Sequence, residues 1–168
     1  MKSHKMIIAI LLILLNTIVI QPVVNAQQAK KDKQASRIVF TKNMIDSQNF
    51  IFVPQSILPM RGSSRHLTSS YELVVSKDTL ISYLPFFGRA YTAPLLPGDN
   101  GFDFTSTNFE YKINNDKKGG WDITIKPKDQ VNVQQFSLRI FDNGSASLNI
   151  TSLNREPISY TGYITGKK

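Results

Sequence analysis

The chain has 168 residues, contains no cysteine and carries a formal net charge of +8 at pH 7. This length fits one ordinary domain with a core of its own. The absence of cysteine excludes disulfide bonds, thiolate chemistry and attachment to a membrane through a lipid-modified cysteine.

Residues 1–26 have the features of a secretory signal peptide. Lysines near the start precede an almost wholly apolar stretch at residues 6–20, and Val24 and Ala26 occupy the −3 and −1 positions of a small-residue cleavage site. The apolar stretch is shorter than the roughly 20 residues that a membrane-spanning helix needs. We therefore predict cleavage after Ala26, a mature chain without a transmembrane helix, and an exported protein that is periplasmic or secreted.

Residues 27–48 are expected to form a polar segment followed by a short helix. Residues 27–35 are polar and rich in lysine, which predicts a mobile stretch. Ser36 is a candidate N-cap for a helix that continues to Ser47. A partial apolar stripe on this helix consists of Ile38, Val39, Met44 and Ile45.

From residue 49 to residue 168 the sequence changes to a period of two. Apolar and polar residues alternate in "FEYKI" (109–113), "WDITIK" (121–126) and "SASLNIT" (145–151). This alternation is typical of antiparallel strands with one buried face and one exposed face. Further strands are expected at residues 50–53, 70–75, 79–84, 136–142 and 158–164, with one more at residues 102–105.

The connections between these segments indicate the same architecture. Asn143-Gly144 predicts a tight hairpin in which both residues adopt positive φ. The apolar parity changes between Val133 and Phe136, which predicts a bulge near Gln134-Gln135. The fold class is therefore mainly β, an antiparallel barrel or sandwich of about eight strands with one short N-terminal helix. A barrel of this size is either filled by side chains or holds one small ligand.

Residue types that support catalysis are sparse. The predicted mature chain has one histidine, His66, and no G-x-S-x-G motif surrounds a serine. Glu110 and Asp122 could be neighbours across two strands, but lysines on the same faces favour charge pairing over a glycosidase pair. We expect no enzymatic activity and no cofactor.

Metal-ligating patterns are equally weak. Zinc sites need clustered histidine and cysteine, which the sequence lacks. The stretch "DNGFD", with Asp99 and Asp103, is slightly similar to a calcium loop but has neither the later ligands nor the terminal glutamate. We interpret it as an ordinary turn and expect no metal site.

The stretch "SYLPFFGRAYTAP" (82–94) is the best candidate for a ligand site. Pro85 ends the preceding strand, and a glycine permits a sharp bend after it. One interpretation is an aromatic rim around a cationic Arg89, suited to an anionic or amphiphilic ligand. The other is a structural corner, with the rings inward and Arg89 held by a carboxylate or by carbonyls. The candidate residues are Tyr83, Phe86, Phe87, Gly88, Arg89 and Tyr91.

Several motifs resemble a family of exported envelope proteins of Bacteroidota-type bacteria that is known as a domain of unknown function. The resemblance extends over residues 49–164, and its central motif is "SYLP-FFGRAY" within "DTLISYLPFFGRAYTAP". The other motifs are "GFDF", "FEYKI", "KKGGWDI" and "NREPISYTGYI". The resemblance implies an envelope location and an all-β domain, and it supplies no activity, cofactor or catalytic residue.

Two functions are compatible with these features. The first is a non-enzymatic binding module that holds a small amphiphile, a lipid or a glycan in a barrel mouth. The alternative is a structural or protein-docking component of the cell envelope that has no ligand. Nucleic acid is not an expected partner of an exported protein.

Overall fold

The computed structural model describes residues 28, 30–92, 101–115 and 119–167. The predicted signal peptide lies outside these residues, so its cleavage stays a prediction. The described part divides into two units, one up to Arg37 and the other from Ile38 onward. Each unit is described by itself below.

A helix spans residues 30–46 and crosses the boundary between the two units. The helix starts earlier than predicted, because Lys, Gln and Ala in this stretch are all good helix formers. Ser36 is therefore not an N-cap. Its Oγ instead donates a hydrogen bond to the carbonyl of Asp32, 2.8 Å away and four residues earlier, as serines in helix interiors do.

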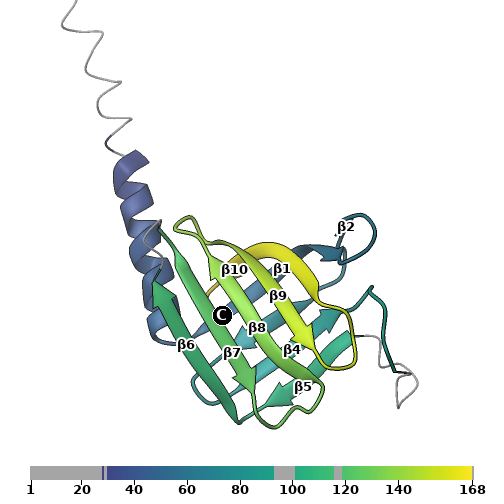
Figure 1. Ribbon diagram of the computed structural model, residues 1–168. Helices are drawn as coiled ribbons and strands as arrows, with labels where there is room; N and C mark the ends of the chain where they lie inside the picture. The colour runs from purple at the N-terminus through teal and green to yellow at the C-terminus, as the bar shows by residue number, and fades with distance from the viewer. Residues whose placement is uncertain (1–27, 29, 93–100, 116–118, 168) are drawn as a thin grey trace, which may run out of the picture. The chain divides into compact units, whose positions relative to one another are not determined.

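The second unit is a nearly closed antiparallel barrel (Figure 1). The described strands form one sheet in the order β5-β4-β3-β1-β10-β9-β8-β7-β6, and the two-residue β2 pairs with β1. A single continuous sheet decides between the two predicted architectures in favour of the barrel. The strands are β1 (Phe50–Pro59), β2 (Arg65–His66), β3 (Glu72–Val75), β4 (Leu80–Pro85), β5 (Gly101–Ser106), β6 (Phe109–Asn115), β7 (Trp121–Pro127), β8 (Val133–Ile140), β9 (Ser145–Ser152) and β10 (Ile158–Thr165).

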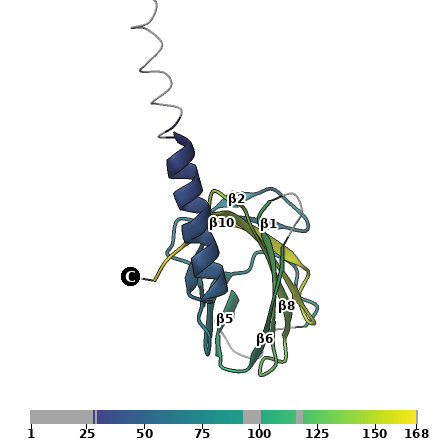
Figure 2. The ribbon, with the colours of Figure 1, turned by 90° about the vertical axis from the view of Figure 1, so that its left-hand side faces the viewer.

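The barrel core comes from the alternation that the sequence shows. Buried residues alternate with more exposed ones along β7, along β8 from Phe136 onward and along β9 as far as Ile150, and these apolar side chains meet those of β1, β3 and β4 inside the barrel. In the side view of Figure 2, β6 and β8 belong to one wall of the barrel and β5 to the opposite wall. The largest fully buried side chains include Tyr160, Phe50, Phe52 and Phe136.

The C-terminal turns of the helix belong to this core. Ile45 is fully buried, Met44 is 7% exposed, and Ile38 packs against the same cluster. The hydroxyl of Tyr111 on β6 donates a hydrogen bond to the carbonyl of Ile45 at 3.3 Å. Residues 38–46 are therefore part of the folded barrel unit.

Two irregularities bend the sheet. The register between β8 and β9 shifts between Val133 and Gln135, which confirms the predicted bulge. A second shift lies in β1 between Pro54 and Ser56. Gly162 faces Pro54 across this second shift, and a Cβ there would lie 2.0 Å from the carbonyl oxygen of Val53, so the position requires glycine.

The hairpin between β8 and β9 differs from the predicted turn. Gly144 has a φ of 82°, but among the described non-glycine residues only Gln48 has a positive φ, so Asn143 does not. The N–H of Gly144 donates to the carbonyl of Phe141 at 2.8 Å. This geometry fits a three-residue loop in which one glycine takes the left-handed position after an ordinary turn.

Candidate functional site

The segment after β4 is packed against the connection between β9 and β10. Phe86 turns inward and meets Phe102 edge-on, with ring centroids 5.7 Å apart. The guanidinium of Arg155 lies 5.3 Å from the Phe86 ring and 5.4 Å from the Phe102 ring. Arg155 is only 7% exposed and donates a hydrogen bond to the carbonyl of Gly101 at 2.6 Å. A buried arginine from a distant segment therefore holds this corner together.

Hydrogen bonds fix the course of the same segment. The N–H of Tyr91 donates to the carbonyl of Asn154 at 2.7 Å, and the N–H of Glu156 donates to the carbonyl of Arg89 at 3.0 Å. The hydroxyl of Tyr160 donates to the carbonyl of Pro85 at 2.6 Å, and burial raises the pKa of this phenol, so it stays protonated. The end of β4 and the segment after it are thus held by hydrogen bonds to β10 and to the connection between β9 and β10.

The predicted site residues are not all brought together. Tyr83, Phe86 and Phe87 line a common pocket, whereas Gly88, Arg89 and Tyr91 are not among its lining residues. The side chains of Arg89 and Tyr91 are exposed. Arg89 contributes its backbone carbonyl to the corner, and the cations that lie over the rings of Phe86 and Phe87 come from other segments.

Sequence reasoning missed both of these cations. Arg155 lies over Phe86, and Arg65 on β2 lies over the exposed ring of Phe87, 5.5 Å from its centroid. The available signal for Arg155 was its place in "NREPISYTGYI", one of the motifs that carry the family resemblance. Arg65 stands beside His66 in a serine-rich stretch that gave no such signal.

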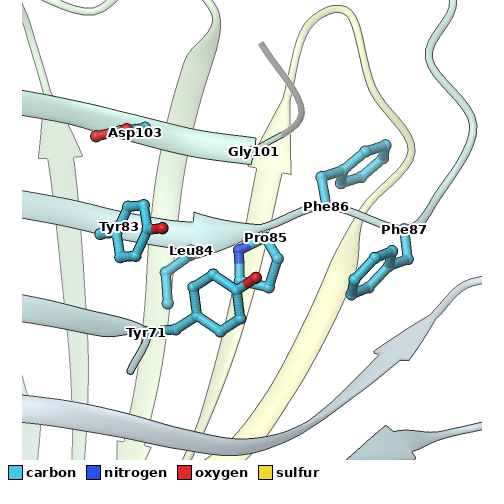
Figure 3. A pocket seen from close by; sticks show the side chains of 8 residues that line it. All are labelled: Tyr71, Tyr83, Leu84, Pro85, Phe86, Phe87, Gly101 and Asp103. Atoms are coloured by element: carbon cyan, nitrogen blue, oxygen red, sulfur yellow. The ribbon is translucent and has the colours of Figure 1, made fainter. Parts of the chain in front are cut away.

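The pocket has a volume of about 460 Å³ (Figure 3). Tyr83 and Asp103 face each other across β4 and β5 in the sheet register, and Tyr71 lies just before β3. The rings of Tyr71 and Tyr83 are tilted by 39°, with centroids 5.3 Å apart. The pocket is lined by Tyr71, Tyr83, Leu84, Pro85, Phe86, Phe87, Gly101 and Asp103.

The pocket lies near the end of β4 and is lined by both exposed and buried residues. Tyr83 is 47% exposed, while its neighbours Ser82 and Leu84 point into the barrel and are buried. Phe87 is 45% exposed and forms part of the lining at the other side of Pro85 (Figure 3). The lining therefore combines the exposed side chains of Tyr83 and Phe87 with residues that are buried in the core or pack against it, namely Leu84, Phe86 and Tyr71.

The electrostatics of the pocket depend on one acid. Asp103 is the charged residue among the described lining residues. It lies in β5, within the strand expected at residues 102–105, and the other acid of the stretch "DNGFD", Asp99, lies outside the described residues. The structure thus gives the pocket an acidic group where the sequence suggested a cationic one.

The carboxylates considered for catalysis form surface ion pairs instead. Glu110 faces Lys126 across β6 and β7, so it is not opposite Asp122. The ammonium of Lys112, 2.8 Å away, lowers the pKa of Glu110. Asp122 pairs with Arg139 at 3.0 Å. Charge pairing is therefore confirmed for Glu110 with Lys112, whereas the partner of Asp122 is Arg139 and not one of the lysines that the sequence suggested.

The part of the chain that the structure describes offers neither a metal site nor a membrane-spanning helix. There, no three histidine, aspartate or glutamate side chains gather as metal ligands would. No helix of that part is long and apolar enough to cross a membrane.

Comparisons with known proteins give one family. A family model with the description "Domain of unknown function (DUF4251)" matches residues 32–164. A crystal structure of a DUF4251 family protein from Bacteroides eggerthii is similar in fold, with a TM-score of 0.57 and 14% sequence identity over 79% of this chain and 91% of that chain. No curated protein matches.

Proposed function

The chain belongs to the DUF4251 family, and from this premise we propose that it is a non-enzymatic binding protein that holds a small amphiphile, lipid or glycan in the pocket beside Tyr83. The single observation that carries the proposal is this pocket, in which aromatic rings surround a few polar groups. Its volume of about 460 Å³ lies in the range of roughly 300–1,000 Å³ that small-molecule sites occupy.

The position of the rings supports binding because they are held before any ligand arrives. The backbone of Tyr83 is fixed by the pairing of β4 with β3 and β5, and its ring packs against that of Tyr71. The chain at Pro85 is held by the hydroxyl of Tyr160. Phe86 is clamped under Arg155. A rigid aromatic site loses little conformational entropy when it binds, which favours affinity.

The alternative is that this end of the barrel docks against another protein of the cell envelope. Exposed apolar side chains on the surrounding segments favour it, since such residues gather at interfaces. These residues are Leu58 (50% exposed), Met60 (61%), Phe87 (45%), Tyr91 (65%) and Leu153 (59%).

Native mass spectrometry of the protein, purified gently from its own cells, separates the two functions. We expect a reproducible extra mass on the wild-type protein, and its loss in Tyr83→Ala. The matched control is Ile81→Ala, because Ile81 is 39% exposed on the same face of β4 but does not line the pocket. A protein mass without ligand, together with crosslinks to one partner, would overturn the binding function in favour of docking.

The same spectrum tests export. We propose that the protein is exported, on the strength of the signal-peptide pattern in residues 1–26. The expected protein mass is that of a chain that begins at Gln27. A mass that includes the first 26 residues would contradict the proposed cleavage.

A further inference from the structure

We propose that the tyrosine side of this pocket is a subsite for a positively charged group of the ligand, such as a quaternary or primary ammonium. The subsite consists of Tyr71, Tyr83 and Asp103. This inference rests on the proposed binding function and names the ligand chemistry that the pocket selects.

The two tyrosine rings are placed to share a cation. Their centroids are 5.3 Å apart and their planes are tilted by 39°, so the rings contact each other, and a cation that sits where the two planes diverge lies within reach of both. Tyr83 is 47% exposed, and Figure 3 shows both rings at the same end of the pocket. Cations bind the faces of aromatic rings within about 6 Å of the centroid, and aromatic cages for ammonium groups are built on this attraction.

Carboxylates flank this aromatic pair. Tyr83 stands opposite Asp103 on β5 and opposite Glu72 on β3, so the three side chains form one row on the outer face of the sheet. Residues that face each other in antiparallel strands have Cβ atoms about 4.5–5.5 Å apart. A cation over the Tyr83 ring is therefore within reach of a carboxylate on a neighbouring strand.

The same arrangement disfavours an anionic group at this position. The carboxylate of Asp103 would repel it, and partial removal from water strengthens that repulsion. Arg89, on which the sequence-based expectation of an anionic ligand depended, is exposed and does not line the pocket. Arg65 lies over Phe87, at the other end of the lining. Its positive charge is therefore remote from the tyrosine side and does not oppose a cation there.

Three amphiphiles with the same octyl chain test the charge preference: octyltrimethylammonium, octyl sulfate and octyl glucoside. Each is titrated into the purified protein below its micelle concentration, and ring signals of Tyr71 and Tyr83 are followed by NMR. The net charge of the full chain is +8, and +6 remains without Lys2 and Lys5 of the predicted signal peptide, so unspecific attraction favours the sulfate. A preference for the ammonium, which is the expected result, therefore has to come from a local site.

Substitution of Asp103 then tests whether its carboxylate causes the preference for the ammonium. Asp103→Asn is expected to weaken ammonium binding by about threefold to tenfold and to leave glucoside binding unchanged. Asp78→Asn is the matched control, because it makes the same charge change at an exposed position in the turn between β3 and β4, outside the pocket. Thermal unfolding of both variants checks that the fold is kept.

The outcomes separate this inference from the proposed function. Equal binding of the three amphiphiles, a preference for the sulfate, or unchanged ammonium binding in Asp103→Asn overturns the cation subsite and leaves the binding function standing. If none of the three amphiphiles shifts the tyrosine signals, both the subsite and amphiphile binding in this pocket are contradicted.

Discussion

At the scale of single residues, the corner after β4 depends on two side chains from the last part of the chain. Arg155 packs over two phenylalanine rings and donates to the carbonyl of Gly101. Tyr160 is fully buried and donates to the carbonyl of Pro85. Both act on backbone carbonyls next to the pocket, so they determine where the lining residues Pro85 and Gly101 stand.

Tyr160→Phe tests this role of the tyrosine hydroxyl. The substitution keeps the ring in the core but leaves the carbonyl of Pro85 without the donor that lies 2.6 Å from it. We expect the free energy of unfolding, measured by urea denaturation, to fall by about 1–3 kcal/mol, the cost of a buried polar group without a partner. Tyr163→Phe is the control, since Tyr163 is 41% exposed, and it should change stability very little. Equal stability of the two variants would contradict the role of Tyr160.

Which arginine lies over the ring of Phe86, Arg89 or Arg155, shows what can and cannot be predicted from the sequence at the scale of residues. The aromatic corner was found, because proline, glycine and clustered rings have local consequences that a short window reveals. The arginine was assigned by its position between those rings in the sequence. In the structure the cation over Phe86 comes from the segment that crosses the corner, and a short window contains no information about that crossing.

At the scale of elements, one carboxylate from the connection between β7 and β8 fixes the loop that joins the two edge strands, β5 and β6. Asp129, in the connection between β7 and β8, accepts a hydrogen bond from Ser106 Oγ at 2.5 Å. Its other oxygen accepts from the N–H groups of Thr107 at 3.0 Å and Asn108 at 3.3 Å. These residues join β5 to β6, so a single carboxylate fixes the chain at the seam of the barrel.

The hydrogen bonds to Asp129, that from Ser106 foremost, lower its pKa, which makes stability depend on pH. Because the folded pKa lies below the unfolded value, the stabilisation is complete above the unfolded pKa and is lost as the pH falls through the folded pKa. We therefore expect Asp129→Asn to be less stable than wild type at neutral pH, with the difference shrinking in acid. Urea denaturation at a series of pH values measures it, with Asp78→Asn as control. A difference that is the same at every pH would show that the charge of Asp129 is not the cause.

Features of the elements were predicted correctly where the local sequence alone determines them. The change of parity between Val133 and Phe136 located a real bulge, because a bulge is recorded directly in the alternation of side chains. The helix was predicted too short, because the polar residues before Ser36 were interpreted as a mobile segment despite their helix propensity. The length of β1 was also underestimated: the strand was expected at residues 50–53, whereas it continues through the register shift beside Pro54 to Pro59.

At the scale of the whole barrel, closure could not be predicted from the sequence. Alternation specifies which face of each strand is buried, but a barrel and a sandwich bury the same faces. The register of β1 with both β3 and β10 decides the matter, since it makes β1 an interior strand of one continuous sheet. That pairing joins segments at opposite ends of the sequence.

The order of strands in the sheet also predicts which strands open most readily. In the described part of the chain, β5 and β6 pair on one side only, whereas β1, β10 and β9 lie inside the sheet. Amides of an edge strand that point away from its neighbour have no ladder partner, and edges open more readily than central strands. We therefore expect hydrogen exchange at neutral pH to be faster in β5 and β6 than in β1 and β10. If β5 and β6 exchanged as slowly as β10, another strand would have to cover the seam, and a dependence of the exchange on protein concentration would then identify a second copy of the chain as its source.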